Sequence, residues 1–227
     1  MCGRYNIIDD PVVHVLLDIL GIDIGPLPTR LNIAPTESVP VVHLHEGKRQ
    51  LSEMRWWLVP HWSNGPSQQY AMFNARSEGI EKSRAYQGPF KYRRAIIPAS
   101  SFVEWKKQDG EKQPVMVQAE ERALAFAGVW DYWSDGIQNI LSCSIITTEA
   151  TKSFGSIHSR MPVILEEENF DSWLAEETPL PKIREMLIPY GKTLIATPVS
   201  RRINNSRSKE LPEPVGEAVR ISDTENA

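Results

Sequence analysis

Short runs of β-branched, aromatic and alternating apolar residues follow one another through most of the chain, and they restrict its fold more than any other feature of the sequence. Each run is a few residues long and is bounded by turn-forming residues, which is typical of strands in a sheet. The runs that predict strands are Val39–His45, Leu51–Val59, Tyr70–Asn74, Ala95–Ile97, Ser101–Lys107, Val115–Gln118, Ala123–Val129, Ile137–Thr147, Met161–Leu165 and Thr193–Val199. Strands therefore dominate the expected structure.

Helical patterns are fewer and short. The first helix is predicted from Pro11 to Leu20, because Asp10 suits the N-cap, Pro11 suits the first turn and Gly21 suits the end. Its apolar residues at helical spacing are Val12, Val15, Leu16 and Ile19. Further helices are predicted at Gly79–Tyr86, Glu149–Ser156, Glu166–Leu174 and Pro181–Ile188. They do not alternate regularly with the strands, which argues against a doubly wound fold.

The turns between the runs predict how the strands pair. Asp109-Gly110 separates two strand-like runs and is a hairpin signal, so neighbouring strands should be antiparallel. We expect an α+β fold with a curled, mostly antiparallel, barrel-like β-sheet and flanking short helices. A chain of 227 residues can bury one large core, and we expect a single domain over residues 1–208. Residues 209–227 are acidic and contain Pro212 and Pro214, which predicts a flexible tail.

The net charge of -4 is unusual for a protein that binds nucleic acid, but the charge is unevenly distributed. Basic residues outnumber acidic ones between Arg55 and Lys107, whereas much of the excess negative charge lies in the tail. This distribution is compatible with an electropositive surface for an anionic partner. The alternative is that these lysines and arginines solvate ordinary strand faces.

Cysteine and histidine usage argues against metal sites and disulfides. Cys2 and Cys143 are too few for a disulfide framework or a structural zinc site. Metal binding by His43, His45 and His61 lacks a third close ligand or a cysteine to complete a site. We expect no metal and no cofactor. No segment approaches the roughly 20 apolar residues of a membrane helix, so we expect a cytoplasmic protein without membrane contact.

Cys2 is the most informative position for chemistry. Removal of Met1 would leave a cysteine with a free α-amine, which is a 1,2-aminothiol. The amine can condense with an aldehyde to an imine, and the thiol can then add to the imine carbon and close a five-membered thiazolidine. The ordinary pKa values of the amine, about 7.7–8.0, and of the thiol, about 8.5, place both groups near neutrality. A cysteine at position 2 can also be incidental.

Three further segments place polar residues within apolar runs: Phe73–Glu78, Phe102–Lys106 and Ile157–Pro162. Glu104 lies inside a predicted strand, where burial would raise its pKa and favour acid or base chemistry. His158 can transfer a proton near neutral pH, or it can be structural. Asn74 and Arg76 can be turn residues, or an amide and a guanidinium directed at a sugar and a phosphate.

The motifs together resemble the SRAP family, named for SOS response-associated peptidases, whose members are abasic-site processing proteins. The resemblance covers most of the chain and rests on several motifs in one order. They are Met1–Tyr5, Asn32–Pro35, Trp56 with Pro60 and Trp62, Asn74–Glu78, Phe102–Trp105, His158–Pro162, and Val199-Ser200 followed by Asn205. The resemblance implies that the mature N-terminal cysteine forms a thiazolidine crosslink with the ring-opened aldehyde of an abasic site in single-stranded DNA.

The same resemblance implies roles for individual residues. Cys2 would be the covalent nucleophile, and Asn74 would position the amine or the deoxyribose. Glu104 would be the acid and base of ring opening and imine formation, and His158 would assist proton transfer, including reversal of the crosslink. Such a protein would be cytoplasmic and, if bacterial or phage, would associate with the nucleoid when bound to DNA. Lyase and autopeptidase activities are further assignments of this kind.

DNA contacts are implied at positions outside this catalytic group. Arg4, Arg76 and Arg160 would bind phosphates, and Pro35 and Trp62 would stack or wedge against exposed bases. The sequence departs from the family pattern at Trp57, at His61 and Ser63, and at Asn205–Arg207. These departures bear on base stacking and DNA affinity and leave the reaction unchanged.

Two other functions are compatible with the same residues. The first is a thiol peptidase or amidohydrolase with Cys2 as nucleophile and His158 as its base, including removal of the protein's own Met1. The second is a non-catalytic reader of modified DNA bases, in which the basic stretch and Trp62 bind and Cys2 has no role.

Overall fold

A small closed barrel forms one half of the molecule. The structure is a computed structural model that describes residues 2–23, 25, 27–67, 69–108 and 110–223. The barrel strands are β3 (Ser38–His45), β4 (Lys48–Trp56), β6 (Arg94–Ala99), β9 (Leu124–Ser134) and β10 (Asn139–Glu149). They pair in the order β10-β4-β3-β6-β9, and β9 pairs again with β10 to close the ring. The β4–β10 pairing is parallel and the others are antiparallel.

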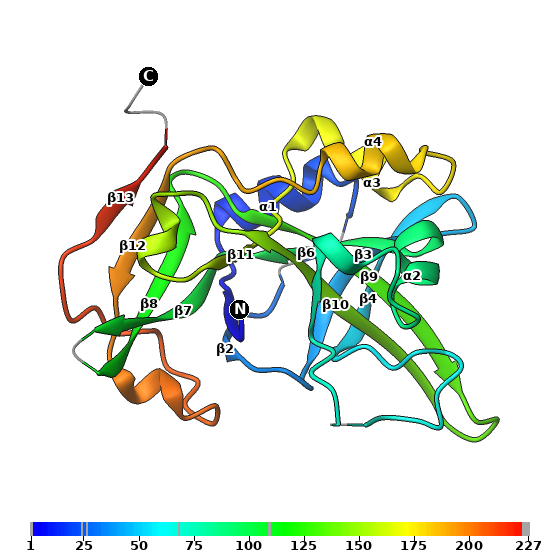
Figure 1. Ribbon diagram of the computed structural model, residues 1–227, viewed down its shortest axis with the longest axis horizontal. Helices are drawn as coiled ribbons and strands as arrows, with labels where there is room; N and C mark the ends of the chain where they lie inside the picture. Colours follow the sequence, from blue (N-terminus) through cyan, green and yellow to red (C-terminus); the bar gives the residue numbers. More distant parts are fainter. Residues whose placement is uncertain (1, 24, 26, 68, 109, 224–227) are drawn as a thin grey trace.

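A six-stranded sheet lies beside the barrel (Figure 1). Its strands, in order across the sheet, are β13 (Val219–Ile221), β12 (Leu194–Pro198), β8 (Glu111–Ala119), β7 (Ser101–Gln108), β1 (Arg4–Ile7) and β2 (Arg30–Ile33). All of these pairings are antiparallel. The curled, mostly antiparallel, barrel-like sheet expected from the sequence is confirmed. The predicted hairpin is also present, because Gln108 lies opposite Glu111, although Asp109 itself is outside the described residues.

Two three-residue strands extend β10 and bring distant segments together. β5 (Asn74–Arg76) runs parallel to β10, with Asn74 opposite Ile145. β11 (Arg160–Pro162) runs antiparallel to β10, with Met161 opposite Thr148. The end of β10 therefore holds two of the polar segments that the sequence singled out.

Short helices flank the sheets, as expected. They are α1 (Pro11–Ile19), α2 (Gln87–Tyr92), α3 (Phe170–Leu174) and α4 (Leu180–Glu185), with 3₁₀ turns η1 (Ser77–Gly79), η2 (Phe154–Ser156), η3 (Glu167–Asn169) and η4 (Arg201–Asn204). In Figure 1, α1, α3 and α4 lie along one edge of the molecule.

The first helix confirms its predicted signals, but the apolar stripe that it buries differs from the set of apolar residues noted at helical spacing in the sequence. The Asp10 side chain accepts a hydrogen bond from the backbone N–H of Val13, and Gly21 follows the helix with a φ of +67°. The buried helical residues are Val13, Leu16 and Leu17, whereas Val15 is 56% exposed. Two overlapping apolar stripes were available on this short helix, and packing against the sheet selected the other one.

Several predicted elements were wrong in place or type. The helix expected at Gly79–Tyr86 is absent, and α2 instead begins at Gln87, with Pro89 in its first turn. Glu149–Ser156 is not an α-helix, because β10 continues to Glu149 and only the 3₁₀ turn η2 is helical. Of the run Tyr70–Asn74, only Asn74 enters a strand. The strands β1 and β2 were not predicted, because each is only four residues long.

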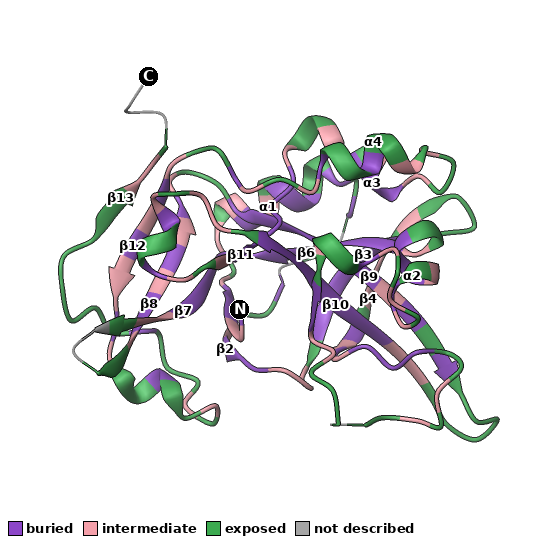
Figure 2. Cartoon of the chain, in the orientation of Figure 1, coloured by how far each residue is buried: buried purple, intermediate pink, exposed green. Residues whose placement is uncertain are grey.

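The core is aromatic where the barrel meets the six-stranded sheet. The ring of Tyr5 lies 5.0 Å from that of Trp56 and 6.1 Å from that of Phe126, both edge-on. Phe102 lies 5.9 Å from Phe126. Figure 2 shows that buried residues follow the strands, while the loops and short helices are mainly exposed. Because Tyr5 in β1 packs on the barrel core, the amino-terminal strand is held firmly at the junction of the two sheets.

One member of the basic stretch is internal. Arg94 is 2% exposed, and its guanidinium donates to the carbonyls of Phe90, Lys91 and Trp173 and to that of Ala175. These carbonyls lie at the ends of α2 and α3, where the helices leave acceptors unsatisfied. The local excess of basic residues is therefore only partly available to an anionic partner.

The carboxyl-terminal segment packs on the domain as far as it is described. Lys209 donates to the Glu37 carboxylate at 2.7 Å and to the carbonyl of Asn32 at 3.1 Å. β13 extends the six-stranded sheet by pairing with β12. The boundary at residue 208 stays a prediction. Within the described residues, no helix is long and apolar enough to cross a membrane.

Candidate functional site

Cys2 lies at the start of the chain beside the middle of β7. In the antiparallel pairing of β1 with β7, Arg4 is opposite Val103 and Tyr5 is opposite Phe102. Extending this register toward the amino end places Cys2 beside the Glu104–Trp105 segment. The Cys2 side chain is fully buried, and burial raises the pKa of its thiol well above the ordinary value. The negative charge of Glu104 raises this pKa further.

Asn74 holds Cys2 from the opposite side. Its Nδ2 donates to the carbonyl of Cys2 at 2.8 Å, and the side chain is fixed by the pairing of β5 with β10. The residue is 8% exposed. Its Oδ1 is buried and finds no donor among the described residues, which leaves an acceptor beside Cys2 that a substrate or the processed amino terminus can use.

Glu104 is an acid placed within a strand and removed from water. It is 1% exposed, and burial raises its pKa from 4.5 to about 7, although the positive charge of the amino terminus acts in the opposite direction. At neutral pH the carboxyl group is therefore populated in both protonation states. A group of this kind can both donate and accept a proton.

His158 lies in the turn that leads into β11. Its Nδ1 is 3.0 Å from the backbone nitrogen of Arg160, whose N–H points at it, and 3.1 Å from the Arg160 carbonyl. Burial, followed by the charge of the amino terminus, lowers the pKa of this imidazole, so the neutral form is favoured near pH 7. The ring is thereby oriented by the backbone of its own turn.

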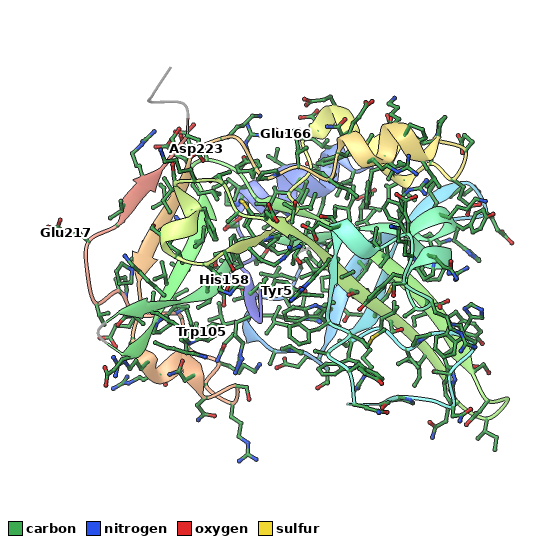
Figure 3. The ribbon with its side chains drawn as sticks, in the orientation of Figure 1. Tyr5, Trp105, His158, Glu166, Glu217 and Asp223 are labelled. Carbon is green, nitrogen blue, oxygen red and sulfur yellow. The ribbon has the colours of Figure 1, made fainter. Side chains whose placement is uncertain are left out.

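A cleft of ≈ 560 Å³ contains both proton-transfer candidates. Its walls come from the β7–β8 hairpin and from η2 with the turn that follows it. The lining residues are Glu104, Trp105, Lys107, Lys112, Gly155, Ser156, Ile157, His158 and Ser159. Figure 3 labels His158 and Trp105 in this part of the molecule, with Tyr5 beside them in the view.

The structure thus brings Cys2, Asn74, Glu104 and His158 into one neighbourhood, each from a different part of the chain. Sequence reasoning missed Trp105, Lys107 and Lys112 as cleft residues. Trp105 belongs to the Phe102–Trp105 motif, but no cleft role was assigned to it. Nothing in the sequence distinguishes Lys107 and Lys112 from other surface lysines.

The three arginines expected to bind phosphate differ in their surroundings. Arg76 is exposed on β5. Arg4 is half-buried, and its Nη2 donates to the Asn204 carbonyl at 3.4 Å. Arg160 forms a two-pronged pair with Glu78 at 2.9 and 3.0 Å and donates to the Thr147 carbonyl at 2.6 Å. Arg160 therefore already has an internal partner, supplied by the turn η1.

The residues expected to touch bases lie in two loops. Pro35 is half-buried in the turn after β2. Trp62 is 43% exposed, and the guanidinium of Arg84 lies 4.0 Å from the centre of its ring. Trp62 is not among the residues that line the cleft described above. Its exposed ring and the neighbouring cation form a separate surface.

His43 and His61, two of the histidines weighed as metal ligands, have protein partners instead. Nε2 of His43 is 2.9 Å from the Ser52 hydroxyl, and Nδ1 of His61 is 3.0 Å from the buried Asp131 carboxylate. Across the described residues, no three histidine, cysteine or acidic side chains are grouped so that they could hold a metal ion.

Comparison with known proteins places the chain in a family. The model of the family described as SOS response associated peptidase (SRAP) matches residues 1–206. The chain belongs to the SRAP family. This confirms the resemblance drawn from the order of its motifs, and the matched region includes every candidate site residue.

Two of the relatives of this SRAP chain match it over nearly its full length. The abasic site processing protein YoaM of Bacillus subtilis is 34% identical over 221 residues, which are 92% of this chain and 95% of YoaM. The abasic site processing protein YoqW of the same organism is 33% identical over 94% of this chain and 99% of YoqW. The abasic site processing protein HMCES of Xenopus tropicalis is 33% identical over 71% of this chain and 56% of HMCES.

Solved structures share the SRAP chain's fold. A protein from Bacteroides thetaiotaomicron superposes with a TM-score of 0.70 at 21% identity, covering 92% of this chain and all of the other. A protein from Bordetella bronchiseptica superposes with a TM-score of 0.73 at 22% identity, covering 88% of this chain and all of the other. These likenesses establish a common fold.

Proposed function

We propose that this protein binds single-stranded DNA at abasic sites and links itself covalently to them through Cys2. Removal of Met1 by hydrolysis gives Cys2 a free α-amine beside its thiol. The ring-opened form of an abasic deoxyribose presents an aldehyde, and the crosslink shields that aldehyde from other reactions. The protein acts here as a damage-response factor that processes the lesion by occupying it.

The reaction forms two bonds at the aldehyde carbon. The α-amine of Cys2 attacks this carbon, and the resulting carbinolamine loses one water to give an imine. The thiol sulfur then adds to the imine carbon, and the thiol proton ends on the nitrogen. The product is a five-membered thiazolidine, and no oxidant or reductant is consumed.

Glu104 and Asn74 support the first bond. With a pKa raised to about 7, Glu104 can accept a proton from the attacking amine and return it to the departing water. Asn74 holds the Cys2 carbonyl at 2.8 Å and offers its free Oδ1 to the amine or the sugar. Positioning of this kind reduces the entropic cost of bringing the two reactants together.

His158 and the arginines serve the rest of the substrate. His158 transfers a proton to or from the sugar during ring opening and during reversal of the crosslink. Arg4 and Arg76 bind phosphates, and Arg160 reaches one by exchanging its pair with Glu78. Pro35 and Trp62 contact bases outside the cleft.

The observation that carries this proposal is the convergence of Cys2, Asn74 and Glu104 at one place. The Asn74 amide contacts the Cys2 carbonyl, and the Glu104 charge acts on the Cys2 thiol. His158 shares a cleft with Glu104. Membership of the SRAP family and relatives named abasic site processing proteins support an abasic site as the substrate.

The thiol-peptidase alternative receives less support from the site. A cysteine nucleophile in a peptidase needs a lowered pKa and an adjacent base that holds the thiolate. Burial and the charge of Glu104 instead raise the pKa of the Cys2 thiol. The neutral aminothiol suits condensation with an aldehyde better than thiolate attack on an amide.

Intact-mass analysis tests the proposal. Protein produced in cells is mixed with uracil-containing single-stranded DNA that has been treated with uracil glycosylase. The expected product has the combined mass of the protein without Met1 and the DNA, less one water, and it survives denaturation. Cys2→Ala should abolish the stable product, and Cys2→Ser should form at most a labile one.

The controls separate the proposed chemistry from simple binding. The same oligonucleotide without glycosylase treatment should give no adduct. Stable adducts formed equally by wild type and Cys2→Ala would rule out the thiazolidine, because that ring requires the sulfur.

A further inference from the structure

We propose that Lys107 and Lys112 form a phosphate-binding subsite for the DNA strand on one side of the abasic nucleotide. This inference rests on the proposed function and deepens it, because it names the part of the substrate that the β7–β8 hairpin recognises. The ligand is two or more consecutive phosphodiesters, and one side of the lesion is favoured over the other.

The sheet register makes the two lysines direct neighbours. In the antiparallel β7–β8 pairing, Lys107 lies opposite Lys112. Residues directly opposite one another point to the same face of a sheet, with Cβ atoms about 4.5–5.5 Å apart. Two ammonium groups therefore project from one place on the hairpin, at a separation that suits neighbouring phosphates of a flexible strand.

The pair has an electrostatic cost that no carboxylate of the described residues offsets through an ion pair. Like charges directly opposite one another destabilise a sheet. Both lysines are exposed, and neither forms an ion pair with a carboxylate among the described residues. The neighbouring Glu111 is paired with Arg201 instead. An anionic ligand would remove this repulsion, and a nucleic acid strand supplies such charges in series.

The two lysines also lie in the cleft where the proposed reaction takes place. Both line the same cleft as Glu104 and His158, and Trp105 lies between Glu104 and Lys107 along β7. Trp105 is half-buried, and its Nε1 donates to the Asn204 side chain at 2.8 Å, which fixes the ring. A strand whose lesion lies at Cys2 and Glu104 would place its next phosphates along this wall.

The test uses the double variant Lys107→Gln/Lys112→Gln and two DNA substrates. One carries its abasic site near the 5′ end and the other near the 3′ end, so that each extends mainly to one side. We expect the variant to bind and crosslink one substrate about tenfold more weakly than wild type and the other almost normally. For the affected substrate, the log–log salt slope should shrink by about 1.4, since each phosphate contributes about 0.7.

A matched variant, Lys48→Gln/Lys91→Gln, removes the same charge from exposed positions that do not line the cleft. It should leave both substrates unaffected, and Lys107→Arg/Lys112→Arg should behave as wild type. Equal behaviour of the Lys107/Lys112 double variant and wild type on both substrates would overturn the subsite. An equal loss on both substrates would also overturn it, because that indicates a general charge effect. If wild-type protein itself forms no crosslink, the proposed function fails first.

Discussion

At the residue scale, the burial of Glu104 connects stability to chemistry. The carboxyl group is 1% exposed on β7, and its pKa is raised from 4.5 to about 7 by burial. Ionising it inside the protein costs free energy that ionising it in the unfolded chain does not. The protein therefore gives up stability to keep an acid that can change its charge at neutral pH. A buried group that lowers stability but titrates near neutral pH is typical of functional sites rather than of groups that stabilise a fold.

Glu104→Gln should remove this cost. Because the folded-state pKa is the higher one, the contribution of Glu104 to stability is fully present below about pH 4.5 and is lost as the pH rises through 7. The difference in free energy of unfolding between Glu104→Gln and wild type should thus grow in favour of the variant from pH 5 to pH 8, by about 2–3 kcal/mol. Urea denaturation at both pH values measures the difference.

Glu168→Gln is the matched control, because this carboxyl is exposed on η3. Its free energy of unfolding should follow that of wild type across the same pH range. A constant difference between Glu104→Gln and wild type from pH 5 to pH 8 would contradict the raised pKa. It would show that the Glu104 side chain titrates as it does in water.

At the scale of single elements, local signals decide where α1 begins but not which side it buries. The Asp10 carboxylate accepts from the Val13 N–H at 3.0 Å, as an N-cap should. The buried stripe then follows the shape of the sheet below it. Capping depends on neighbours within one turn, whereas the choice of face depends on residues that are distant in sequence.

Asp10→Ala should therefore weaken the helix without altering the site. We expect a loss of about 1 kcal/mol in the free energy of unfolding, which is the usual value of an N-cap carboxylate. Asp18→Ala, at an exposed position near the end of the same helix, should have a smaller effect. Thermal denaturation of both variants provides the comparison, and equal melting temperatures would argue against the cap.

At the scale of the whole molecule, Asn32 joins the two ends of the chain. Its Nδ2 donates to the carbonyls of Ile203, Asn205 and Ser208 at 3.2, 2.9 and 3.0 Å. Its own N–H donates to the Asn6 side chain at 2.7 Å. These bonds hold the segment around η4 against β1 and β2, where Asn204 contacts both Arg4 and Trp105. The carboxyl-terminal segment thus supports one wall of the proposed site.

Asn32→Asp should release this segment. The substitution replaces a buried donor by a carboxylate facing carbonyl oxygens, which costs about 2–4 kcal/mol of unfolding free energy. We expect proteases to cut the chain faster within residues 201–208, and we expect weaker DNA binding. Asn139→Asp is the control, because Oδ1 of Asn139 only accepts a hydrogen bond from Tyr132, which a carboxylate can also do. Equal protease resistance of both variants would show that Asn32 does not anchor the segment.

Much of the fold was predictable because its causes are local. Alternating apolar runs predicted β3, β7 and β12 closely and β8 only in its second half, and Gly110 marked the turn between β7 and β8. Barrel closure was not visible in this way, since it depends on β9 and β10 pairing with strands on both sides. The short strands β1, β2 and β5 lack a strong pattern. β1 and β5 pair with the longer strands β7 and β10, and β2 pairs with β1 at the edge of the sheet.

The sequence by itself determined which residue types were available for chemistry: a cysteine next to the initiator methionine, a carboxyl within an apolar strand, and polar residues in motifs of a recognisable order. Only the tertiary structure decided that Cys2, Asn74 and Glu104 meet, that Arg160 is paired with Glu78, and that Lys107 and Lys112 face the same cleft. The physical reason is that composition and periodicity act over a few residues. Burial, charge pairing and the shape of a cleft arise from segments that the chain brings together across distances of about 70 to 170 residues.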